Sequence, residues 1–105
     1  MDKLTDLEIC KRIAEIEGLI FCTGNRYARI EIRKEGKLYK YSQYNPLTDG
    51  ALCFKLMVKY KISLIQHQNN NAVYCIWDHD EKHATNTMWN ANRSICLAII
   101  QSKEQ

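Results

Sequence analysis

One short charged segment has the residue types and spacing of a metal site. It reads His79-Asp80-Glu81-Lys82-His83, with two histidines four residues apart. On a helix this spacing would place both imidazoles on one face, beside carboxylates that also bind metals. The flanking residues do not predict a helix, and His67 lies far along the chain. We therefore keep a metal-dependent enzyme as an alternative and favour a solvated loop, with neither metal nor other cofactor.

The cysteines are spaced for burial and not for zinc binding. The five residues are Cys10, Cys22, Cys53, Cys75 and Cys96. Zinc ligands usually come in pairs two to four residues apart, whereas no two of these cysteines are closer than 12 positions. Each has hydrophobic neighbours, so we expect five free thiols in the core of a cytoplasmic protein. The sequence also lacks a glycine-rich phosphate loop, a nucleophile elbow and a paired-carboxylate motif, and we expect no enzyme.

A basic, aromatic strand pair is the strongest candidate for an interaction surface. Alternation over residues 27–33 places arginines on one side, and residues 38–41 return as the partner strand. The candidate surface residues are Arg29, Arg33, Lys37, Lys40, Tyr39, Tyr41, Tyr44 and Trp89. Such residues suit a protein partner or a second copy of the chain, or they could stack the bases of a single-stranded nucleic acid. Of the two tryptophans we expect Trp77 or Trp89 in the core, and an exposed one would anchor a protein partner.

Three helices must position these residues. Thr5 and Glu8 form a capping box that begins the first helix, and Gly18 ends it. A central helix is expected over residues 45–61, with Asn45 as its cap and Pro46 in its first turn. The last helix begins after a capping asparagine, either Asn90 or Asn92.

The strands are expected at residues 19–22, 27–33, 38–41, 62–65, 72–77 and 85–89, with a charged loop over residues 78–84. The chain has 105 residues, 46% of them hydrophobic, which fits one globular domain over residues 1–105. We expect an α+β fold, with an antiparallel or mixed sheet of four to six strands covered by three helices. The expected core residues are Leu7, Ile13, Ile30, Ile32, Phe54, Val58, Leu64, Ile76, Ile95 and Ile99.

Charge and hydropathy limit the classes of partner. The net charge is +3, which permits nucleic-acid binding but falls short of a clustered basic footprint. The longest apolar runs are far shorter than the roughly 20 residues of a membrane span. We expect a protein that does not enter the membrane.

In its order of motifs, the chain resembles the small phage-encoded proteins of the NinX-like, phage ABA-sandwich group. The motifs are Leu4-Thr5-Asp6-Leu7-Glu8-Ile9, Tyr44-Asn45-Pro46-Leu47-Thr48-Asp49, Lys61-Ile62-Ser63-Leu64, a hairpin bearing Trp77, and Asn92-Arg93-Ser94-Ile95-Cys96-Leu97-Ala98-Ile99. The resemblance implies a phage or prophage origin, a layered α-β-α fold and location in the host cytoplasm, with no established biochemistry.

These observations lead to one expected function. We expect an accessory protein that binds a host factor, a defence system or a phage replication or recombination component. Binding of single-stranded nucleic acid is the first alternative, and the metal-dependent enzyme is the second.

Overall fold

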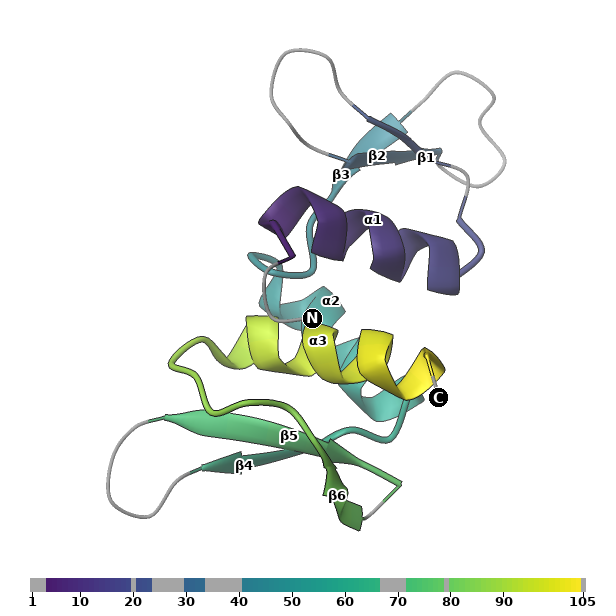
Figure 1. Ribbon diagram of the computed structural model, residues 1–105. Helices are drawn as coiled ribbons and strands as arrows, with labels where there is room; N and C mark the ends of the chain where they lie inside the picture. The colour runs from purple at the N-terminus through teal and green to yellow at the C-terminus, as the bar shows by residue number, and fades with distance from the viewer. Residues whose placement is uncertain are drawn as a thin grey trace. The chain divides into compact units, whose positions relative to one another are not determined.

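The computed structural model describes residues 4–19, 21–23, 30–33, 41–66, 72–78 and 80–104. Within these ranges the fold is α+β, with three helices and two separate three-stranded antiparallel sheets (Figure 1). The expected single sheet of four to six strands is therefore not found. Contacts divide the chain into two compact units, essentially Lys3–Asn45 and Pro46–Gln105. Each unit contains one sheet, and the expectation of a single domain remains a prediction.

The first unit contains α1 (Asp6–Ile16) and a sheet in the order β1-β2-β3. The strands are β1 (Phe21–Thr23), β2 (Ile30–Arg33) and β3 (Tyr41–Tyr44). Of the expected return strand over residues 38–41, only Tyr41 is described; it begins β3, which continues past the expected end, and residues 38–40 lie outside the described residues. Ile30 pairs with Tyr44 and Arg33 pairs with Tyr41.

Both ends of α1 follow from its sequence. The Thr5 hydroxyl accepts from the Glu8 amide at 3.2 Å, and the Glu8 carboxylate accepts from the Thr5 amide at 3.3 Å. These bonds confirm the capping box and lower the pKa of Glu8. Gly18 adopts a φ of 70°, and the next amide, of Leu19, donates to the Ala14 carbonyl. This geometry is the Schellman motif, which requires the left-handed conformation that glycine adopts without strain.

The second unit contains α2 (Gly50–Lys59), α3 (Ala91–Lys103) and a sheet in the order β4-β5-β6. Its strands are β4 (Ser63–Gln66), β5 (Val73–Trp77) and β6 (Asp80–Ala84). Helix α3 packs on β5 and on α2. The strand β6 corrects the expected loop over residues 78–84, because a polar segment can pair with the central strand β5 through its backbone alone. The expected strand at 85–89 is reduced to one bridge, between Val73 and Met88.

Helix α3 carries much of the core of this unit. Asn90 is its cap and accepts from the Arg93 amide at 3.1 Å, which decides between the two asparagines. All residues from Ser94 to Ile100 are buried. Such a continuous buried run is wider than the stripe that a surface helix normally presents.

Helix α2 begins later and faces a different way than its sequence suggests. Its cap is Asp49, which accepts from the Leu52 amide at 3.2 Å, and residues 46–48 form a turn. Cys53 and Leu56 are buried, whereas Phe54 and Val58 are 61% and 60% exposed. Assigning Phe54 and Val58 to the core is therefore wrong, and Leu64, at 40% exposed, is wrong too. Apolar residues occupy most of the circumference of α2, so periodicity alone does not select the buried side.

Helix α2 ends in a second Schellman motif, in which a lysine takes the place of glycine. Lys61 has a φ of 55°, and the Ile62 amide donates to the Met57 carbonyl at 3.0 Å. Because this conformation strains a side chain but not glycine, we expect Lys61→Gly to raise the free energy of unfolding by about 0.5–1 kcal/mol. Urea denaturation measures the change. Lys55→Gly, inside α2, is the matched control and should lower stability by about 1 kcal/mol. If both variants lowered the free energy of unfolding equally, the strained conformation assigned to Lys61 would be contradicted.

Candidate functional site

The expected surface residues fall into three groups. Arg29, Lys37, Tyr39 and Lys40 lie outside the described residues. Arg33 and Tyr41 are cross-strand partners in β2 and β3, where the structure describes only their backbone. The side chains of the remaining two, Tyr44 and Trp89, are described.

Of these two side chains, Trp89 is exposed as expected of a surface residue, whereas Tyr44 is buried, which corrects its place among the surface residues. Along β3, side chains alternate between the two sides of the sheet, so that Gln43 is exposed and Tyr44 is only 4% exposed. Tyr44 therefore offers no surface to a partner. Trp77 is 3% exposed and Trp89 is 73% exposed, which agrees with the expectation that one tryptophan belongs to the core.

Trp89 stands beside the contact between α3 and α2. Three residues after it, the Asn92 side chain donates to the Leu47 carbonyl at 3.0 Å. The Cys53 thiol of α2 lies 3.7 Å from the Asn92 carbonyl oxygen. These contacts fix the beginning of α3 against α2, so Trp89 projects from an anchored segment. An exposed tryptophan beside a fixed helix start is the type of residue that concentrates binding energy at protein interfaces.

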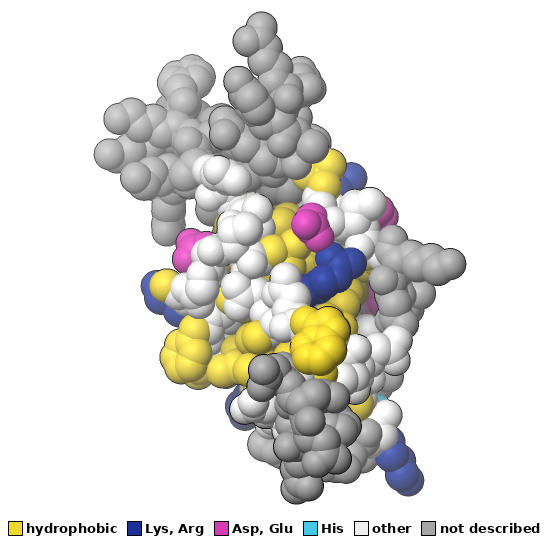
Figure 2. Space-filling view, turned by 90° about the vertical axis from the view of Figure 1, so that its left-hand side faces the viewer, with side chains coloured by type: hydrophobic (Ala, Val, Ile, Leu, Met, Phe, Trp, Pro, Cys, Tyr) yellow, Lys and Arg dark blue, Asp and Glu magenta, His cyan; other side chains and the backbone are white. Residues whose placement is uncertain are grey.

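The exposed side of α2 supplies further apolar surface. Ala51, Phe54 and Val58 follow one another at helical spacing, and all three are exposed. Figure 2 shows hydrophobic side chains exposed on one face of the molecule, with Lys and Arg side chains close to some of them. Single exposed apolar residues are ordinary, but a row of them on one helix is typical of an interaction surface. Sequence reasoning missed this row because it assigned Phe54 and Val58 to the core.

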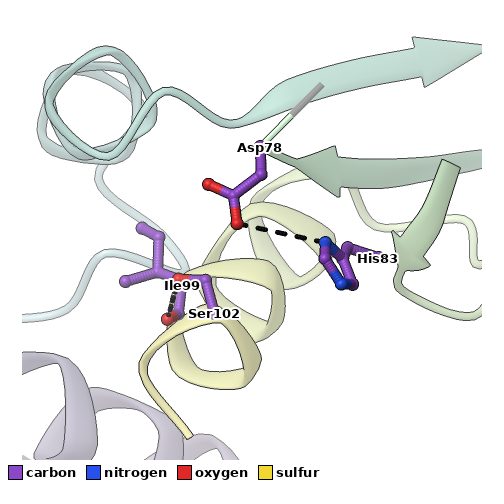
Figure 3. A network of polar contacts seen from close by, with 4 residues as sticks. All are labelled: Asp78, His83, Ile99 and Ser102. Carbon is purple, nitrogen blue, oxygen red and sulfur yellow. Dashed lines mark hydrogen bonds and ion pairs between the residues drawn. The ribbon is translucent and has the colours of Figure 1, made fainter. Parts of the chain in front are cut away.

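The charged segment forms a hairpin and not a helix. Asp78, with a φ of 58°, turns the chain between β5 and β6. Its carboxylate lies 3.9 Å from Nδ1 of His83. Figure 3 shows the two side chains turned toward each other. The His83 ring stacks on Trp77 with centroids 5.7 Å apart. His79 is outside the described residues. Among the residues that are described, no group of three or more His, Cys, Asp or Glu side chains could hold a metal ion.

A buried polar network joins β5, the segment after β6, and α3. The Thr85 hydroxyl accepts from the Cys75 amide at 2.9 Å and lies 3.1 Å from the Ser94 hydroxyl. The Ser94 hydroxyl donates to the Cys75 sulfur at 3.2 Å. All three residues are buried, and burial raises the pKa of the Cys75 thiol to about 11. A neutral, enclosed thiol is a poor nucleophile, so the network holds the fold together and offers no reactive group.

The cysteines whose side chains the structure describes form no disulfide. They are Cys10, Cys53, Cys75 and Cys96, and all four are buried. The Cys96 thiol hydrogen-bonds to Cys53 and so lowers the pKa of Cys53. The side chain of Cys22 lies outside the described residues, and the expectation that its thiol is free as well stays a prediction. Titration of the unfolded, unreduced chain should then count five thiols.

The raised pKa of Cys75 predicts a loss of stability in alkali. In the unfolded chain this thiol ionises near 9.0, while in the folded protein it stays neutral up to about 11. Its contribution to stability is therefore complete below pH 9.0 and is lost as the pH rises towards 11. Urea denaturation measures the free energy of unfolding of wild type and of Cys75→Ala at about pH 8 and about pH 10.5. The difference in favour of wild type should be smaller at the higher pH. A difference in the free energy of unfolding that is the same at both pH values would contradict the raised pKa.

A hollow of about 250 Å³ lies on α1, in the first unit. Its walls are the side chains of Glu8, Lys11, Arg12 and Glu15. Two basic groups lie between two acidic groups along the helix, so their charges compensate one another. The hollow has neither the net charge nor the apolar lining that would select a ligand.

Comparisons with protein-family models, with curated proteins and with solved structures found no significant match to this chain. Within the described parts of the chain, no helix is both long enough and apolar enough to cross a membrane.

Proposed function

We propose that the protein acts by binding another protein, and that Trp89 is the anchor of the contact. The observation that carries this proposal is the 73% exposure of a tryptophan that directly precedes the cap residue of α3. Burying such a side chain in a partner typically contributes several times more than an average contact. The exposed row on α2 gives the same unit additional apolar area. The proposal assigns no catalytic step to the chain.

The particular protein we propose is a small phage or prophage accessory protein of the host cytoplasm. Its partner would be a host factor, a defence system or a phage replication or recombination component. The support for this origin is the order of short motifs described for the NinX-like group, from the capped first helix to the closing helix. The support for a partner is the exposed apolar surface.

Affinity capture from infected host lysate tests the proposal. Wild type should enrich one partner, and Trp89→Ala should reduce its recovery on the order of tenfold or more. Lys82→Ala is the matched control, because Lys82 is an exposed residue of the hairpin β5–β6 and should leave recovery unchanged. Lack of any enriched protein, or equal recovery with Trp89→Ala, would contradict the proposal. Enrichment of nucleic acid that survives removal of protein would favour the nucleic-acid alternative.

A further inference from the structure

The exposed side of α2 combines an apolar strip with a parallel basic strip. At 3.6 residues per turn, Phe54, Val58, Ala51, Lys55 and Lys59 follow one another around about 140° of the helix. All five are exposed, and the first three make up the apolar strip while the two lysines make up the basic one. The remaining positions of α2 include the buried Cys53 and Leu56, which face the core of the unit.

Two further lysines extend the basic strip at the end of α2. Lys61 is exposed directly after the helix. The ammonium groups of Lys59 and Lys103 lie 5.5 and 5.1 Å from the ring centroid of Tyr60, so the end of α3 adds a positive charge here. Helix α2 itself contains no acidic residue.

Acidic residues lie at the margins of this surface. Asp49 is the cap at the opposite end of α2, and Glu104 follows the last residue of α3. Along residues 51–61, which contain the apolar strip, every charged residue is a lysine. Opposite charge on a partner would steer its approach and fix its register.

We infer that this surface binds an amphipathic helix of a partner protein that carries a row of acidic residues beside its apolar face. The inference deepens the proposed function and rests on it. Phe54 and Val58 are four residues apart, which is the spacing at which one helix offers anchors to another. An acidic row on the partner would meet the lysine strip while its apolar residues cover Phe54. A second copy that docked through this same surface would bring the same lysines and offer them no opposite charge.

A matched pair of synthetic amphipathic peptides tests this inference directly. Both have the same apolar face, and one carries glutamates where the other carries lysines. Titrated into the ¹⁵N-labelled full chain, the acidic peptide should shift the amide signals of α2 and bind on the order of tenfold more tightly than the basic one. Its affinity should fall as salt is added, because salt screens exposed charges.

Variants of exposed residues make the outcome decisive. Phe54→Ser should weaken binding of the acidic peptide on the order of tenfold. A Lys55→Glu, Lys59→Glu double variant should bind the basic peptide more tightly than the acidic one. Equal affinity for both peptides, or shifts confined to residues away from α2, would overturn the inference. Concentration-dependent dimerisation abolished by Phe54→Ser would overturn it in favour of a second copy.

The same variants separate this inference from the proposed function. A partner captured from lysate whose recovery depends on Trp89 but not on Phe54 or Lys55 would leave the proposed function intact and overturn the acidic-helix inference. If lysate yields no partner while the acidic peptide still binds as described, the proposed function fails and the chemistry of the surface stands.

Discussion

Ile99→Ala is expected to lower the free energy of unfolding by about 3 kcal/mol, the largest effect we predict for a single substitution. Ile99 is 0% exposed and lies in the continuous buried run of α3. Truncation there removes apolar contacts and leaves a cavity that its surroundings fill only in part. Urea denaturation, followed by circular dichroism, measures the change.

The matched control is Val58→Ala, on α2. Val58 is 60% exposed, so little apolar contact is lost, and alanine is the better helix former by about half a kcal/mol. We expect a change within about 0.5 kcal/mol in either direction. A loss as large as that of Ile99→Ala would show that Val58 is buried in solution and would contradict the exposed strip on α2.

Thr85→Val is expected to lower the free energy of unfolding by about 1–3 kcal/mol, although valine has nearly the same shape as threonine. The Thr85 hydroxyl accepts from the Cys75 amide and is a hydrogen-bond partner of the Ser94 hydroxyl. Valine would leave these buried polar groups without the partner on which they depend. Because Thr85 is 6% exposed, water cannot readily replace the lost bonds.

Thr85→Ser separates the hydroxyl from the methyl group. Serine keeps the hydroxyl and should cost less than about 1 kcal/mol, the contribution of one buried methyl group. The same denaturation experiment compares the two variants. If valine is tolerated as well as serine, the hydrogen-bond network does not contribute to stability as proposed.

The sequence predicts helix ends well where a side chain specifies them. Thr5 with Glu8 at α1 and Asn90 at α3 are short-range signals, because the capping bonds join residues three apart. At α2 the choice was wrong because Asn45 and Asp49 both suit a cap. The structure selects Asp49, and residues 46–48 turn before the helix.

Strand positions depend on pairing partners that the sequence does not reveal. Strand β5 was predicted from its alternation, whereas β6 has the composition of a loop and forms because β5 offers it an edge. The division of the strands into two sheets is a long-range property for the same reason. No local pattern distinguishes two sheets from one.

The candidate surface was predicted only in part. The expectation that an exposed tryptophan would anchor a partner could be stated from the sequence, but only packing shows that the exposed one is Trp89. The strip on α2 was missed because the helix has apolar residues on two sides, and either side could have faced the core. One signal pointed to the outer side: Lys55 and Lys59 lie beside Phe54 and Val58 around the helix, and lysines rarely enter a core.

Fluorine NMR of the chain labelled with 5-fluorotryptophan tests the central claim, that a partner protein covers Trp89. The chain has two tryptophans, an unlabelled partner adds no signal, and Trp89→Phe assigns the resonances. In the free protein, the signal of Trp89 should shift between H₂O and D₂O, and that of Trp77 should not. When the captured partner is added, we expect the Trp89 signal to move and lose its solvent shift, with Trp77 unchanged. A Trp89 signal that keeps its position and its solvent shift in the complex would contradict the claim.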